Sequence, residues 1–184
     1  MALLEDGGYE GFTIAALCER AQVPPRAIYD RADTKDALFL AVYEHGIARV
    51  VADHAIFDDQ ARWADLPADQ LAAQAVHAVA DIFIRHAALL RSVVLISGAH
   101  PEVYRRGAGY TRLLGDQFAA VVLRARDRIT QTDPEAAARA SFTTVFSTMV
   151  VRVAYGPAFT NPSMDDDTFV DALAGMVQRY LFGR

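Results

Sequence analysis

Residues able to contact a DNA phosphate or a base edge are concentrated between positions 13 and 35. This segment carries hydroxyl, phenol, guanidinium and ammonium groups, which commonly bind DNA backbones and bases. The candidates for DNA contact are Thr13, Pro25, Arg26, Tyr29, Arg31, Thr34 and Lys35. The alternative is that the threonines cap helices and the charged side chains form ordinary solvated surface.

The apolar spacing around these residues predicts two short helices joined by a tight turn. Ile14, Leu17 and Cys18 are three and four residues apart, which places them on one face of a helix. Proline presets φ at a first helical position, so Pro25 predicts the start of the second helix. A third helix is expected after Thr34, and its N-terminal N–H groups favour a phosphate. This order is that of a helix-turn-helix, whose second helix enters the major groove.

The same segment resembles the N-terminal domain of the TetR family of bacterial transcriptional regulators. The resemblance covers roughly residues 7–50 and rests on Gly8-Tyr9, Thr13, Ile14-Ala15, Ala21 before Val23, Ile28-Tyr29, and Lys35 with Leu38. It implies that residues 1–50 bind a palindromic operator as a homodimer. It also implies that residues 51–184 hold a small effector that releases the DNA. The recognition helices, about residues 25–31, would enter major grooves about 34 Å apart.

Several features depart from the family pattern, among them the residues at Pro24, Arg26 and Arg31, and three others bear most on DNA binding. Gln22 stands where the family usually has glycine, so the turn requires a non-glycine residue in a left-handed conformation. Ala32 replaces an aromatic residue that normally packs the motif against the next helix. The family's first helix usually begins well before Met1, so the first helix is expected to be incomplete. These departures favour an alternative function, a helical dimeric small-molecule-binding protein that has lost DNA binding.

Composition favours a helical protein with a buried core. Of the 184 residues, 53% are hydrophobic, and glycine and proline are few. A formal charge of −5 excludes a globally basic nucleic-acid coat but not a local DNA-reading surface. Cys18 is the only cysteine, which excludes intrachain disulfides and cysteine zinc sites. No signal peptide or apolar run of roughly 20 residues is evident, so we expect a cytoplasmic protein.

Helical periodicity continues to the C-terminus and predicts an all-α protein with a C-terminal helical bundle. Helices are expected over residues 34–55, from Pro67, over 86–97, over 110–129, from Pro134 and after Asp165. Gly107 and Gly109 are expected to separate a short helical turn from the helix over 110–129. The last two long helices are apolar on more than one side and therefore need two partners. The bundle is thus expected to dimerise through them.

Aromatic and polar side chains of the bundle could hold a small organic molecule. The candidate ligand contacts are Phe83, His86, Tyr104, Tyr110, Phe118, Phe142, Phe146, Met149 and Arg152. Together they suggest an apolar or aromatic effector, and Arg152 could meet an anionic group. The alternative is that each belongs to the core or to an interface.

Other chemistry has no supporting pattern in the sequence. His45 and His54 are nine residues apart, as are His77 and His86, so each pair points to opposite faces of a helix. The stretch Gly107-Ala108-Gly109 follows no predicted strand and is not a phosphate cradle. No nucleophile elbow surrounds a serine. We therefore expect no metal, no cofactor and no enzymatic activity.

Overall fold

A computed structural model describes residues 2–30, 32–159 and 162–183, which form helices and loops without a strand. The all-α prediction is confirmed. The elements are α1 (Ala2–Gly11), α2 (Ile14–Ala21), α3 (Pro25–Tyr29), α4 (Lys35–Asp53), η1 (His54–Phe57), α5 (Gln60–Ala64), α6 (Ala68–Arg85), α7 (Ala87–Ser97), α8 (Pro101–Val122), η2 (Leu123–Arg128), α9 (Pro134–Tyr155), η3 (Pro157–Phe159) and α10 (Asp166–Phe182). Within the described ranges, none of these helices is both long and apolar enough to cross a bilayer.

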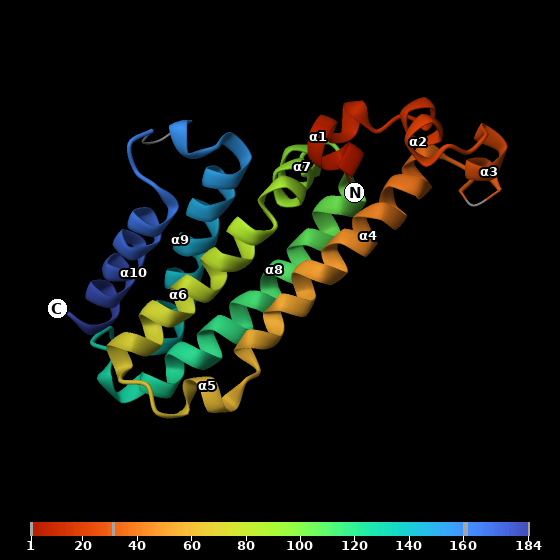
Figure 1. The fold of residues 1–184 in the computed structure, drawn as a ribbon. Helices are drawn as coiled ribbons and strands as arrows, with labels where there is room; N and C mark the ends of the chain where they lie inside the picture. The colour runs from red at the N-terminus through yellow and green to blue at the C-terminus, as the bar shows by residue number, and fades with distance from the viewer. Residues whose placement is uncertain (1, 31, 160–161, 184) are drawn as a thin grey trace.

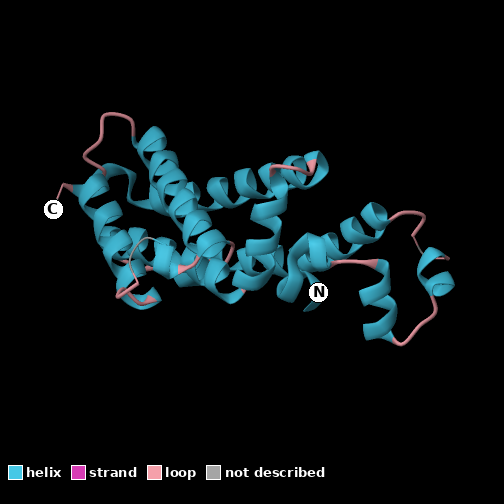
Figure 2. Cartoon of the chain, turned by 90° about the horizontal axis from the view of Figure 1, so that it is seen from above, coloured by secondary structure: helices cyan, strands magenta, loops and turns pink. Residues whose placement is uncertain are grey.

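Helices α1, α2 and α3 lie at one end of the molecule, beside the start of α4 (Figure 1). Seen from above, α2 and α3 project beyond the helical body (Figure 2). Contacts between aromatic side chains connect this end to the helical body. Tyr9 meets the ring of Phe39 edge-on at 4.9 Å, and Phe12 lies 6.0 Å from the same ring. His100, which caps α8, lies 5.5 Å from Phe39. This aromatic cluster (Tyr9, Phe12, Phe39, His100) buries apolar surface that short helices cannot bury alone.

Helix α6 lies at the centre of the body and packs against α8, α9 and α10. Its buried face includes small residues, Ala72, Ala75 and Ala78, which let neighbouring helices approach closely. Helix α9 packs in turn against α7 and α8. Helix α4 lies along α8, where the Arg106 guanidinium donates to the Glu44 carboxylate (Figure 1). The body therefore holds several helices around a shared interior, as the bundle prediction requires.

The predicted break at Gly107 and Gly109 is wrong, because α8 is one continuous helix from Pro101 to Val122. Each glycine costs about 1 kcal/mol of helix propensity relative to alanine. Burial of α8 residues such as Leu114 and Phe118 outweighs that cost. The helix also ends earlier than predicted, and a 3-10 segment, η2, occupies residues 123–128.

Candidate DNA interface and effector pocket

The turn between α2 and α3 has the geometry of a helix-turn-helix. The Thr13 hydroxyl accepts a hydrogen bond from the Ala16 N–H at 3.1 Å and so caps α2. Gln22 adopts the left-handed conformation, with φ of 52° and ψ of 43°. Its N–H donates to the carbonyl groups of Cys18 and Glu19, which ends α2. The prediction of a left-handed, non-glycine residue at position 22 is confirmed.

Helix α3 presents the candidate reading face. Pro25 occupies the first turn and, like Arg26, is exposed to solvent. The Tyr29 side chain is 53% exposed although it is large and aromatic. Ala27 and Ile28 are half-buried on the side that packs against α2. Exposed side chains on the second helix of such a motif are the ones that can reach base edges. Arg31, the remaining candidate on this segment, lies outside the described residues.

The two candidates at the start of α4 are partly engaged within the protein. The Thr34 hydroxyl accepts from the Ala37 N–H at 3.0 Å, and its own O–H can still donate to a phosphate. The Lys35 ammonium donates to the Tyr9 carbonyl at 3.3 Å and lies 4.1 Å from the centre of the Tyr9 ring. The Tyr9 hydroxyl in turn donates to Asp36. Lys35 therefore ties α1 to α4 and keeps two N–H groups for a phosphate.

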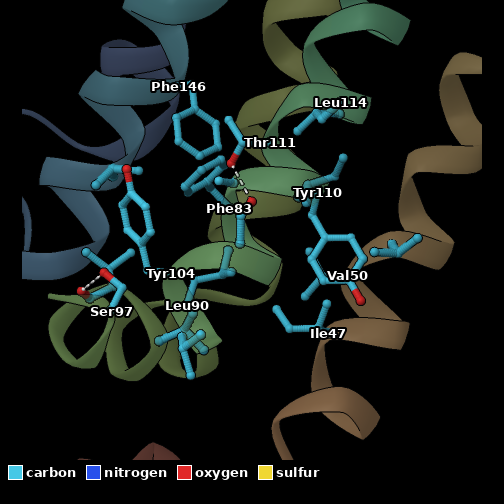
Figure 3. Close-up of a pocket in the computed structure, with 18 of the residues that line it drawn as sticks. Ile47, Val50, Phe83, Leu90, Ser97, Tyr104, Tyr110, Thr111, Leu114 and Phe146 are labelled. Carbon is cyan, nitrogen blue, oxygen red and sulfur yellow. Dashed lines mark hydrogen bonds between the residues drawn. The ribbon is translucent and has the colours of Figure 1, made fainter. Parts of the chain in front are cut away.

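A cavity of about 280 Å³ lies in the helical body and is the candidate effector pocket (Figure 3). Its wall comes from α4, η1, α6, α7, α8 and α9. The lining is mostly apolar and includes Ile47, Val50, Val51, Ile82, Phe83, Leu90, Val93, Val94, Val103, Leu114, Phe146 and Val150. Helix α8 contributes two small residues, Gly107 and Ala108, which leave space on that side. An interior of this kind suits an apolar molecule with few polar groups.

Six hydroxyl or imidazole side chains line the pocket, and four of them, on Tyr43, His54, Ser97 and Thr111, differ in their hydrogen bonding. The Ser97 hydroxyl donates to the Val94 carbonyl at 2.7 Å, and the Thr111 hydroxyl donates to the Gly107 carbonyl at 3.0 Å (Figure 3). The buried Tyr43 hydroxyl and His54 Nδ1, in contrast, have no partner among the described residues. Buried polar atoms without partners are uncommon, because each loses its bonds to water.

Burial also sets the charge of these two unpartnered groups. It raises the pKa of the Tyr43 phenol, chiefly because the phenolate would lose its hydration. It lowers the pKa of the His54 imidazole for the corresponding reason, and Asp53 and Asp58 only partly oppose this effect. Both groups are therefore neutral near pH 7. They can form hydrogen bonds with neutral polar groups of an otherwise apolar ligand.

The structure brings four of the nine predicted ligand residues into this pocket: Phe83, Tyr104, Tyr110 and Phe146. Phe118 and Phe142 instead pack together in the core, with ring centres 5.7 Å apart. His86 points to the Asp53 carboxylate at 2.8 Å, and this hydrogen bond lowers the pKa of Asp53. Met149 and Arg152 lie on α9 beside a different cavity.

Sequence reasoning missed the contribution of α4 to the pocket. Tyr43, Ile47, Val50 and His54 all line it. The first three fall on one stripe of α4, because they are spaced three and four residues apart. That spacing gives no indication of whether an inner face packs against side chains or borders a cavity. The small residues of α8 were the available signal, since small side chains inside a long helix leave room beside it.

Comparisons with known proteins agree with this architecture. Residues 1–42 match the family model of bacterial regulatory proteins of the tetR family. A TetR-family regulatory protein from Rhodococcus RHA1 is 19% identical, with a TM-score of 0.72 over 98% of this chain and 91% of that chain. PfmR, a TetR-family regulator from Thermus thermophilus, is 14% identical, with a TM-score of 0.68 over 97% and 93%. A transcriptional regulator from Cytophaga hutchinsonii is 14% identical, with a TM-score of 0.66 over 98% and 93%. No curated protein matches the sequence.

A helix-turn-helix carried on an all-helical body defines a class of DNA-binding transcriptional regulators. The match over residues 1–42 is specific to one family within that class, and the fold of the remaining chain is the one seen in solved members. Residues 1–42 therefore match the N-terminal domain of the tetR family of bacterial regulatory proteins, and the whole chain has the fold of solved TetR-family regulators.

Proposed function

We propose that the protein is a cytoplasmic, ligand-responsive repressor without enzymatic activity. In this proposal it binds a palindromic operator as a homodimer and is released by a small apolar or aromatic effector. The observation that carries the proposal is that α4 belongs to both sites. Its first residue, Lys35, lies at the candidate DNA interface, and Tyr43, Ile47 and Val50 line the effector pocket.

Helix α4 can transmit a displacement from the effector pocket to the candidate DNA interface. It contains 19 residues and is therefore about 28 Å long. A molecule that wedges α4 away from α8 tilts the helix, and the tilt moves α2 and α3 with its first turn. The effector lowers DNA affinity only to the extent that it binds the tilted state more tightly.

A homodimer is supported by the outer surfaces of α9 and α10. Val151 and Tyr155 on α9 are exposed, and so are Met176 and Tyr180 on α10. Large exposed apolar side chains on two long helices are typical of a surface that a second subunit covers. Two-fold symmetry would then place two α3 helices in successive major grooves about 34 Å apart.

The first test is selection of binding sites from a random duplex pool at physiological salt. We expect one palindrome to be enriched and its affinity to fall steeply with salt concentration. Arg26→Ala should weaken binding by about tenfold, as expected for the loss of a base or phosphate contact. Arg112→Ala, on α8, is the control and should leave DNA affinity unchanged. If the folded protein enriches no sequence, the repressor proposal fails in favour of a binding protein that has lost DNA recognition.

The second test addresses the effector pocket with N-phenyl-1-naphthylamine, a neutral aromatic probe whose fluorescence rises in apolar surroundings. The probe should bind saturably and should weaken binding to the selected operator. Ala108→Leu fills the pocket and should abolish both effects while leaving operator affinity intact. Circular dichroism controls for folding of this variant. Unchanged probe binding by Ala108→Leu would mean that the pocket is not the effector site.

A further inference from the structure

A second cavity, also of about 280 Å³, lies beside the end of α6, the start of α7 and the last turns of α9. It shares no lining residue with that pocket, although α6, α7 and α9 contribute to both. We propose that this cavity binds a small monocarboxylate with an apolar body. The carboxylate would accept hydrogen bonds from Arg152 and Arg91. This inference does not depend on the proposed effector pocket.

Arg152 is the main observation behind this proposal. Its side chain is only 4% exposed, although it carries a charge. The Asp166 carboxylate accepts from Arg152 Nε at 2.7 Å and pairs with Nη2 at 2.6 Å. Nη2 also donates to the Met164 carbonyl at 3.1 Å, and the guanidinium lies 4.2 Å from the centre of the Phe169 ring. These contacts together hold the guanidinium in place.

One nitrogen of this fixed group is nevertheless left without a partner. Arg152 Nη1 is buried and makes no hydrogen bond with any described residue. A buried guanidinium N–H has lost its water, and nothing in the described part of the protein replaces it. Arg152 is one of the residues that line the second cavity, so a ligand oxygen that reaches Nη1 from there would supply the missing acceptor. The positions of Nε and Nη2 are already fixed by Asp166, which reduces the entropy cost of adding that bond.

The charges around the cavity select an anion. Arg91 on α7 also lines it, and its side chain is exposed. The wall carries two guanidinium groups, of Arg91 and Arg152, and one carboxylate, of Asp166, which leaves one net positive charge among its charged residues. Ala87 and Ala88, the first residues of α7, border the same space.

The remaining wall selects the body of the ligand. Ile84, Met149 and Val153 line it with aliphatic and thioether surface. Pro157 closes the end next to α9. A fully hydrated anion such as phosphate gains nothing from these contacts, whereas an aliphatic or aromatic carboxylic acid buries its hydrocarbon there. A ligand that complements this wall has one anionic group and one apolar body, as a monocarboxylate does.

The test is calorimetric titration of the full chain with benzoate and, separately, with benzamide. Benzamide has nearly the same shape but no charge. We expect saturable binding of benzoate and at least tenfold weaker binding of benzamide, because a charge-assisted hydrogen bond is lost. Arg91→Gln should weaken benzoate binding by about tenfold, whereas Arg112→Gln makes the same charge change on α8 and should have little effect.

Two further variants separate this site from others. Ala108→Leu blocks only the effector pocket and should leave benzoate binding unchanged. Arg152→Lys keeps the charge but removes the guanidinium geometry, and it should reduce binding further than Arg91→Gln if it folds. The proposal is overturned if benzoate does not bind saturably, if benzamide binds equally well, or if Arg91→Gln and Arg112→Gln behave alike. It is also overturned if Ala108→Leu abolishes benzoate binding.

Discussion

Alanine substitution of three glycines on α8 should change the stability of the protein in opposite directions, depending on the position. Gly107, Gly109 and Gly115 all lie between the ends of α8. A Cβ built on Gly107 or Gly109 has no atom within 4 Å. A Cβ on Gly115 would lie 2.8 Å from Cε1 and 2.9 Å from Cδ1 of Phe142 on α9. Alanine at the first two positions should therefore stabilise the protein, and alanine at the third should destabilise it.

The magnitudes follow from two opposing effects. Gly→Ala inside a helix gains about 0.5–1 kcal/mol, because alanine loses less backbone entropy on folding. At position 115 the methyl group must displace the Phe142 ring, which is only 6% exposed and held 5.7 Å from Phe118 and 5.6 Å from Phe146. Overpacking of this kind costs about 1–3 kcal/mol. We expect Gly109→Ala and Gly115→Ala to differ by about 1–3 kcal/mol in unfolding free energy.

The assay is urea unfolding followed by circular dichroism, at one fixed protein concentration because dimerisation contributes to stability. Gly107→Ala and Gly109→Ala are matched controls on the same helix. Phe142→Leu replaces the crowded ring with a smaller side chain. In a double-mutant cycle, Gly115→Ala should therefore destabilise the Phe142→Leu variant less than it destabilises the unmodified protein. The reasoning is refuted if Gly115→Ala stabilises the protein as much as Gly109→Ala does.

Three further predictions concern charged and titratable groups. Burial lowers the pKa of His54, so the imidazole of the unfolded chain takes up a proton before that of the folded protein as the pH falls below about 6.5. The free energy of unfolding should then drop by at most about 1.4 kcal/mol per pH unit. In urea titrations, His54→Gln should flatten that part of the pH profile. Arg106→Ala removes the ion pair with Glu44 between α8 and α4, and it should lower the melting temperature in calorimetry more than Arg26→Ala does. An equal melting temperature for these two variants would show that the pair contributes nothing. Lys35→Ala should lower both the operator affinity and the melting temperature, because Lys35 also donates a hydrogen bond to α1. Arg26→Ala should lower the operator affinity alone. An unchanged melting temperature for Lys35→Ala would contradict the structural role of Lys35.

The two cavities have consequences for regulation that extend beyond one effector. Leu90 faces the effector pocket and its neighbour Arg91 lines the second cavity, so α7 forms part of both walls. On α9, Val150 lines the effector pocket and its neighbour Met149 lines the second cavity. The two proposed ligands would therefore contact different residues of the same helices. Coupling between the two sites would be reciprocal, as thermodynamic linkage requires.

Residues that are neighbours in the chain are enough to specify the helix-turn-helix and the class of fold. Thr13 and Thr34 can cap only the helices that follow them, and a proline at position 25 starts a helix, so these local rules predict the order of α2, α3 and α4. The left-handed conformation at position 22 was predicted from the family resemblance, because glycine is usual there in the TetR family. Such features depend on residues close together in the chain.

Packing between distant segments set the continuity of α8, the engagement of Lys35 and the composition of the pocket. Gly107 and Gly109 remain helical because distant residues bury their neighbours on the same helix. Arg152 was predicted to share one ligand site with Phe83, but the two residues line different cavities. Periodicity identifies which side of a helix faces inward, since it follows from the helical repeat. Which inner faces meet, and where they leave a cavity, depends on how several helices fill one volume, and that is settled only by packing.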